Sequence, residues 1–211
     1  MQLIHETDLS AEEYVSTQAW RDAKLERCPN HPDGGCRFAR HGTYARKTPV
    51  GLKVARYYCP DSPMTFSLLP RFMAAGMAGT LHAVEDSVAA VESEDGLAAA
   101  ADRVRPGHHG DPRAARRWIR RRAVLVETFL GIVIGLFPDL FAGTPIRIDA
   151  FREHAGTGSV LITLRLLCTD HLQTLPTPVG FRRSSADAGS QTGPPTHDGP
   201  CRGLRHGPKR L

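Results

Sequence analysis

The sequence predicts an α+β protein in which a small β-hairpin module precedes a mainly helical domain and a disordered C-terminal tail. Three observations lead to this prediction. Three of the five cysteines cluster between residues 28 and 59, around two short β-prone runs. Apolar residues recur at helical spacing from residue 81 onward. Residues 176–211 hold six prolines and six glycines in 36 positions, with few large apolar side chains, which is typical of disorder.

The charge of the 211-residue chain is segregated along its length. The net charge of +5 and the pI of about 9.2 mildly favour an acidic partner such as nucleic acid. Residues 74–102 carry six acidic residues and no Lys or Arg, whereas residues 103–122 carry eight arginines and only Asp111 as an acid. These blocks predict surfaces of opposite sign.

Two segments of the chain bear on its cellular compartment and on whether it crosses a membrane. The first residues lack the basic-then-apolar order of a secretory signal, which predicts a cytoplasmic protein, where clustered cysteines indicate metal ligands before disulfides. The most apolar segment, residues 123–142, is interrupted by Glu127, Pro138 and Asp139. A membrane-spanning helix needs about 20 apolar residues, so we predict a buried core helix and no membrane partner.

The first two segments of the chain are residues 1–27 and 28–70. An N-terminal helix is expected over 9–27, capped by Ser10 with Glu13 completing a capping box. Residues 28–70 form the hairpin module, with strands at 41–47 and 52–58 joined by the turn-forming sequence TPVG. A lone hairpin is marginal in water, and a metal ion that ties its ends would stabilise it.

The remaining segments are residues 71–142, 143–175 and 176–211. In the helical domain, an apolar stripe over 81–91 and a short helix over 97–104 precede a break at 105–110. Asp111 and Pro112 then suit the N-cap and first position of a helix to about residue 135. Residues 143–175 are a mixed segment with a strand at 160–167, followed by a buried Cys168. Residues 176–211 are the tail.

The cysteine cluster has the spacing of a metal site. In Cys-Pro-Asn-His, Cys28 and His31 stand three residues apart, and Cys36 follows across a Gly-Gly pair that allows a sharp bend. Cys59 ends the second strand, and a hairpin brings its two ends together. Thiolates and imidazole in a tetrahedron are what Zn²⁺ prefers. We predict a structural zinc ion bound by Cys28, His31, Cys36 and Cys59.

The fourth ligand is open. A zinc ribbon usually supplies a second pair of ligands as Cys-x-x-Cys, but here Ser62 stands at the second cysteine position, so only Cys59 remains. His31 fits by spacing, His41 is the alternative, and Asp61 is less favoured. The segment offers no placed glutamate that would act as a general base, so the zinc is expected to be structural rather than catalytic.

A second feature is the arginine-rich start of the last long helix. Five arginines fall within an arc of roughly 140° at 3.6 residues per turn, opposite Trp118 and Ile119. Arg122 points toward the apolar side. Guanidinium groups suit phosphates and guanine edges, so we predict nucleic-acid contact. The predicted contact residues are Arg113, Arg116, Arg117, Arg120 and Arg121. The alternative is pairing with the acidic stretch 85–102 or with another protein.

The run from residue 28 to residue 70 resembles the zinc-ribbon region at the start of bacterial insertion-sequence transposases and their uncharacterised relatives. The resembling features are the Cys-Pro knuckle, the sequence HGTYAR, the strand end RYYCP and the sequence TFSLLP. The resemblance implies a helix-turn-helix that binds element DNA, to which residues 95–122 are similar. Fewer than half of the residues remain after residue 130, too few for the catalytic domain of such enzymes.

These observations lead to two hypotheses. The first is a non-enzymatic, cytoplasmic DNA-binding protein with a zinc ribbon, either a transposase-related fragment or a standalone relative. The second is a protein-interaction module in which the apolar helix 123–142 and the acidic helix 81–95 form a homo-oligomer interface. No small-molecule substrate is expected, because phosphate-binding or dinucleotide-binding glycine patterns are absent from the sequence.

Overall fold

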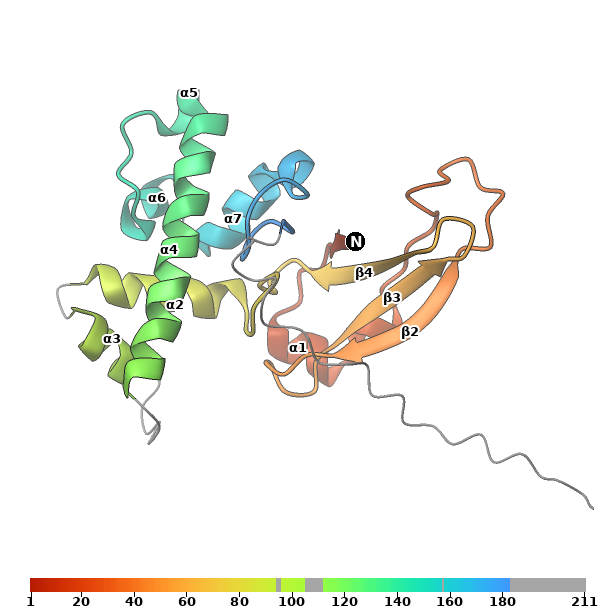
Figure 1. The fold of residues 1–211 in the computed structure, drawn as a ribbon, viewed down its shortest axis with the longest axis horizontal. Helices are drawn as coiled ribbons and strands as arrows, with labels where there is room; N and C mark the ends of the chain where they lie inside the picture. Colours follow the sequence, from red (N-terminus) through yellow and green to blue (C-terminus); the bar gives the residue numbers. More distant parts are fainter. Residues whose placement is uncertain (94–95, 105–111, 157, 183–211) are drawn as a thin grey trace, which may run out of the picture.

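The structure, a computed structural model, describes residues 1–93, 96–104, 112–156 and 158–182. Within them the chain is α+β, as predicted: a mixed four-stranded sheet and a group of helices lie side by side (Figure 1). The sheet and helix α1 (Ala11–Ser16) form one half, which we call the sheet half. The helices between residues 81 and 167 form the other, which we call the helical half.

The sheet contains the predicted hairpin and two further strands. Strands β2 (Ala39–Ala45) and β3 (Lys53–Cys59) pair antiparallel, and the turn between them has Gly51 at φ 84°, so the hairpin and its turn are confirmed. Strand β4 (Met64–Pro70) adds antiparallel to β3, and β1 (Gln2–His5) adds parallel to β4. The expected lone hairpin is therefore wrong, because the strand order is β1-β4-β3-β2.

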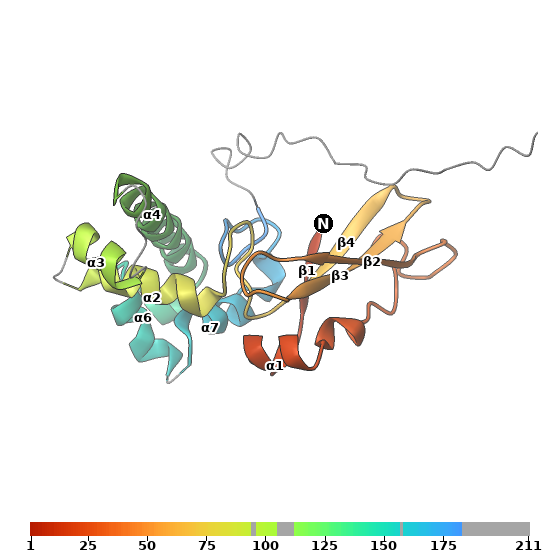
Figure 2. The same cartoon turned by 90° about the horizontal axis from the view of Figure 1, so that it is seen from below.

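The N-terminal helix is shorter than expected. Helix α1 (Ala11–Ser16) has the predicted capping box of Ser10 and Glu13, but it ends at Thr17, whose hydroxyl donates to the Glu13 carbonyl at 2.7 Å. After Gln18, at φ 55°, only the short 3-10 helix η1 (Ala19–Arg21) follows. Figure 2 shows α1 running along one face of the sheet, where its Tyr14 is fully buried.

Seven α-helices are present in the described residues, six of them in the helical half, and they enclose the largest buried cluster. The predicted helices at 81–91, 97–104 and 112–135 are confirmed within one residue at each end. Asp111 and the break at 105–110 lie outside the described residues. The helical half consists of α2 (Leu81–Glu92), α3 (Gly96–Val104), α4 (Pro112–Leu136), α5 (Pro138–Phe141), α6 (Ile148–Ala155), α7 (Val160–Leu167) and the 3-10 helix η2 (Thr169–His171).

The strand expected at 160–167 is wrong, because these residues form α7. Val160, Ile162 and Thr163 are β-branched and favour a strand locally. The buried positions, however, are 160, 161, 164, 165 and 168, which is helical spacing. Cys168 is buried as expected, but it is the C-cap of α7 rather than a strand residue.

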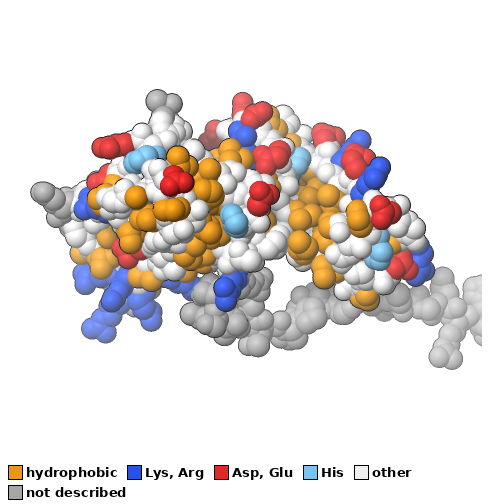
Figure 3. All heavy atoms as spheres, turned by 90° about the horizontal axis from the view of Figure 1, so that it is seen from above, with side chains coloured by type: hydrophobic (Ala, Val, Ile, Leu, Met, Phe, Trp, Pro, Cys, Tyr) orange, Lys and Arg blue, Asp and Glu red, His pale blue; other side chains and the backbone are white. Residues whose placement is uncertain are grey.

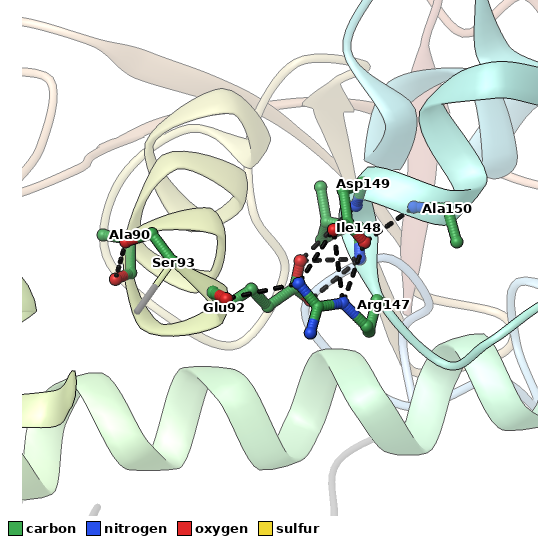
Figure 4. A network of polar contacts seen from close by, with 7 residues as sticks. All are labelled: Ala90, Glu92, Ser93, Arg147, Ile148, Asp149 and Ala150. Atoms are coloured by element: carbon green, nitrogen blue, oxygen red, sulfur yellow. Dashed lines mark hydrogen bonds and ion pairs between the residues drawn. The ribbon is translucent and has the colours of Figure 1, made fainter. Parts of the chain in front are cut away.

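Two acidic residues of α2, Glu85 and Glu92, accept hydrogen bonds at the starts of α7 and α6. The face of α2 that carries them therefore packs against these helices. The Glu92 carboxylate accepts from the backbone N–H of Ile148 at 2.8 and 3.0 Å, at the start of α6 (Figure 4). The buried Glu85 accepts from the Ser159 hydroxyl at 2.7 Å, from the Leu161 N–H at 3.3 Å and from Arg152 at 3.0 Å. Carboxylates at helix N-termini complement the helix dipole.

A buried guanidinium ties the two halves together. Arg165, fully buried in α7, donates to the carbonyls of Arg71 and Met73 after β4, at 2.8 and 2.6 Å. It also donates to the carbonyls of Pro178 and Val179, at 2.7 and 2.9 Å. Residues 176–182 are thus packed into the fold. The predicted start of the disordered tail at residue 176 is therefore wrong for these seven residues. The remainder of the tail, 183–211, lies outside the described residues.

Replacing Arg165 with methionine should destabilise the protein by about 2–5 kcal/mol, because four buried carbonyls lose their donor. Equilibrium unfolding in urea measures the change. The control is Arg182→Met at an exposed position, which should stay within about 0.5 kcal/mol of the unmodified protein. Equal unfolding midpoints for Arg165→Met and the unmodified protein would contradict this account.

Candidate metal centre

The loop between η1 and β2 folds Cys28 and His31 onto each other. The His31 N–H donates to the Cys28 carbonyl at 3.0 Å, and the Gly34 N–H donates to the His31 carbonyl at 3.0 Å. Gly34 and Gly35 then take φ values of 88° and 82°, a conformation that side chains disfavour, and turn the chain back toward Cys36. The local sequence therefore forms a tight knuckle that presents three donor atoms.

The fourth donor comes from the sheet. Cys59 is the last residue of β3, and its sulfur lies 3.5 Å from His31 Nδ1, while the Cys28 sulfur lies 3.4 Å from the same nitrogen. The donor atoms of Cys28, His31, Cys36 and Cys59 all lie within 4.8 Å of one another. These four side chains, which the sequence singled out, therefore lie close together and can hold a metal ion.

The cluster is embedded in a small apolar core. Cys28 and Cys59 are buried, and Cys36 and His31 are half-buried. Phe38 stacks on Tyr57 with ring centroids 5.3 Å apart and meets Phe66 edge-on at 5.9 Å, next to the cluster. Four protein donors would fill the shell of a tetrahedral metal ion, which is typical of structural sites.

The thiols differ in their acidity. Burial raises the pKa of the Cys28 thiol, but hydrogen bonds with His31, with the Asn30 backbone and with Cys59 outweigh burial and lower that pKa to about 7. Burial is the main cause that raises the pKa of Cys36 above its ordinary value. The Cys28 thiol therefore loses its proton more readily than the Cys36 thiol, which must give up a proton to bind a metal.

The structure places His31, rather than His41, among the cysteines. His41 lies exposed on β2, where its ring is 5.5 Å from that of Tyr58. Asp61 is engaged elsewhere: it accepts from the Arg37 N–H at 2.7 Å and from the Arg37 side chain at 3.1 Å. These backbone and side-chain hydrogen bonds lower the pKa of Asp61.

Sequence reasoning missed the residues that brace the knuckle against the turn after β3. Besides Arg37, Asn30 contributes, because its side-chain amide donates to the Ser62 hydroxyl at 2.6 Å. Ser62 stands where a ribbon would carry another cysteine, so a hydrogen bond between the two loops replaces a further ligand there. The signal was the polar pair that follows Cys59-Pro60, Asp61 and Ser62.

The five predicted arginines lie exposed on α4. Figure 3 shows a cluster of Lys and Arg side chains that projects from the helical half. Ile119 is buried on the opposite side, as predicted. Arg122 also turns inward: it is 6% exposed, its guanidinium lies 3.7 Å from the centroid of the Trp118 ring, and it donates to the Ala78 carbonyl at 2.8 Å.

Comparisons with protein-family models, with curated proteins and with solved structures found no match. A search of the described helices for one long and apolar enough to cross a bilayer also found none.

Single substitutions should identify the ligands. We expect Cys59→Ser and His31→Ala to lose the bound metal, because each removes one of four donors. His41→Ala and Cys168→Ser are the controls and should keep one metal ion per chain, since both side chains lie outside the cluster. Metal content after gel filtration, by plasma mass spectrometry, measures the outcome. Loss of metal in His41→Ala with retention in His31→Ala would overturn the assignment.

Metal binding should release protons at neutral pH. Because the pKa of Cys36 is raised, its thiol is protonated at pH 7 in the metal-free protein and must give up that proton. The number of protons released should fall as the pH rises, and the apparent affinity should rise with it. Calorimetric zinc titrations in two buffers of different ionisation enthalpy measure this release. Identical heats in both buffers at pH 7 would contradict it.

Proposed function

We propose that the protein is a non-enzymatic DNA-binding protein in which a structural zinc ion holds the knuckle to the sheet and the arginine face of α4 contacts DNA. The observation that carries the proposal is the convergence of three cysteines and one histidine in a chain that also presents an arginine-faced helix. The zinc would fold the protein rather than react.

Zinc suits the donor set in both chemistry and size. Thiolate and imidazole are its preferred ligands, with Zn–S distances of about 2.3 Å and Zn–N distances of about 2.0–2.1 Å. In a tetrahedron these bond lengths give a sulfur-to-nitrogen edge of about 3.5 Å. The two sulfur-to-nitrogen distances in the cluster are 3.4 and 3.5 Å. These two edges of the cluster therefore match a zinc tetrahedron.

The arginine face of α4 suits a phosphate backbone. Arginine forks match phosphate oxygens in two-point contacts, and five of them on one side of a helix form a dense positive surface. The α2 carboxylates of Glu85 and Glu92 bond to residues of α6 and α7. These two carboxylates are therefore not partners of the α4 arginines. The resemblance to transposase ribbon regions supports the same proposal, for a transposase-related fragment or a standalone relative.

A second candidate function is homo-oligomerisation. The observation that favours it is a row of exposed apolar side chains at intervals of four or eight residues along α4 and α5. They are Val124, Ile132, Leu136 and Leu140, each between 38% and 54% exposed. Figure 3 shows apolar side chains gathered over the helical half. Apolar rows of this kind mark interfaces between chains, and a dimer would also bring two arginine faces to one DNA.

DNA binding should depend on charge at α4. Reversing two arginines, in Arg116→Glu with Arg120→Glu, should abolish binding to duplex DNA at moderate salt while zinc content stays unchanged. For the unmodified protein, log K should fall linearly with log salt, and the neutral variant Arg116→Gln with Arg120→Gln should lower that slope by about 2. Fluorescence anisotropy with a labelled duplex measures both quantities.

The matched control for the charge reversal is Arg21→Glu with Lys24→Glu, the same change at exposed positions of the sheet half. This control should bind duplex as the unmodified protein does. If the unmodified protein binds no DNA at low salt and light scattering shows a concentration-dependent dimer, the oligomerisation candidate is favoured and the DNA proposal fails.

A further inference from the structure

A cleft with a volume of about 1000 Å³ lies between the sheet half and the helical half. Its floor is the face of the sheet opposite Ala55, Tyr57 and Cys59, and carries Arg56 and Ser67. Its other wall is the loop 76–78 together with residues of the segment 173–181. Neither the metal cluster nor the five arginines of α4 lie in this cleft.

The cleft is lined by positive charge without negative charge. Arg46, Lys47 and Arg56 line it, and its lining includes no Asp or Glu. Within the described part of the chain, none of the three pairs with a carboxylate. Unpaired cations in a hollow raise the local concentration of anions. The cleft therefore suits an anionic ligand.

Two of these cations are held in place. The Arg46 guanidinium donates to the carbonyls of Ala74 and Met77, which fixes it against the loop that forms the far wall. The Arg56 guanidinium lies 5.9 Å from the centroid of the Tyr44 ring. Arg56 is half-buried on a central strand, where an unpaired charge is costly. An anion bound in the cleft would offset that cost.

Aromatic rings stand beside these cations. Tyr44 from β2 and Phe181 from the C-terminal segment both line the cleft, and both are half-buried. Rings next to basic side chains are the features with which proteins bind single-stranded nucleic acid, because unpaired bases stack on the rings while phosphates meet the cations. Bases inside a duplex are paired and cannot stack in this way.

The cleft continues toward α4. A second, smaller hollow of about 210 Å³ borders the same loop and is also lined by Trp118, Arg121 and Arg122. Both hollows are lined by Gly76, Met77 and Ala78. Basic side chains therefore line both hollows that border the loop 76–78, and Arg121 of the α4 arginine face belongs to the second one. Two hollows that border one loop suit a strand better than a single free nucleotide.

We propose that the cleft binds single-stranded nucleic acid, with phosphates at Arg56 and Lys47 and a base on Tyr44, and that the strand continues over the loop 76–78 to α4. The proposal rests on the proposed DNA-binding role of α4 for the second part of this path. It adds a second contact surface, on the sheet, and a preference for unpaired bases.

Two cleft variants test the proposal with the full-length, metal-loaded protein. Arg56→Gln with Lys47→Gln removes two cations, and Tyr44→Leu removes the ring without changing the charge. Each should weaken binding to a labelled oligothymidine of about 20 nucleotides, the first by about tenfold and the second by at least fivefold. Binding to a duplex should change less than twofold. Lys24→Gln with Lys53→Gln is the charge-matched control outside the cleft and should leave single-strand binding unchanged.

The outcomes separate this proposal from the proposed function. If both cleft variants bind oligothymidine as the unmodified protein does, with unchanged urea midpoints, the cleft proposal is overturned whether or not duplex binding depends on α4. If duplex binding is absent but oligothymidine binding depends on the cleft, the cleft stands and the proposed role of α4 fails. Tight, cleft-dependent binding of ATP without binding of oligothymidine would identify a nucleotide site and would overturn the strand proposal.

Discussion

The constraint on which the sheet half depends is the meeting of four donor atoms at the end of β3. Residues 22–38 form no regular helix or strand, so the knuckle that carries Cys28, His31 and Cys36 has little backbone pairing of its own. The knuckle is attached to β3 at Cys59, whose sulfur lies 3.5 Å from His31 Nδ1, and Phe38, just before β2, packs on Tyr57. In the proposed account, a zinc ion supplies this attachment and stabilises the open end of the hairpin.

Two arginines connect the sheet half to the helical half through hydrogen bonds to backbone carbonyls. Arg165 joins the chain after β4 to the segment 178–179, and Arg46 joins the end of β2 to the loop 74–77. These bonds hold the loop 76–78 between the sheet face and α4. The proposed nucleic-acid surface therefore has two parts, and its geometry depends on two guanidinium groups that are bonded to backbone carbonyls.

The sequence predicted the features that are local. Ligand spacing in Cys-Pro-Asn-His, the capping box at Ser10 and the arginine periodicity of α4 all act within one or two turns of chain. It did not predict β1, whose parallel pairing with β4 joins residues more than 60 positions apart. It also left open whether His31 or His41 is the fourth ligand, because the distance of each from Cys59 depends on the fold of the sheet. It mistook α7 for a strand because Glu85, 74 residues before Ser159, supplies the contact at its N-terminus.

X-ray absorption at the zinc edge of the purified 211-residue chain distinguishes a structural zinc site from an empty cysteine cluster. We expect one zinc ion per chain with three sulfur ligands at about 2.3 Å and one nitrogen ligand at about 2.0 Å. A protein that is folded without zinc, or a zinc shell made of oxygen and nitrogen alone, would contradict this expectation.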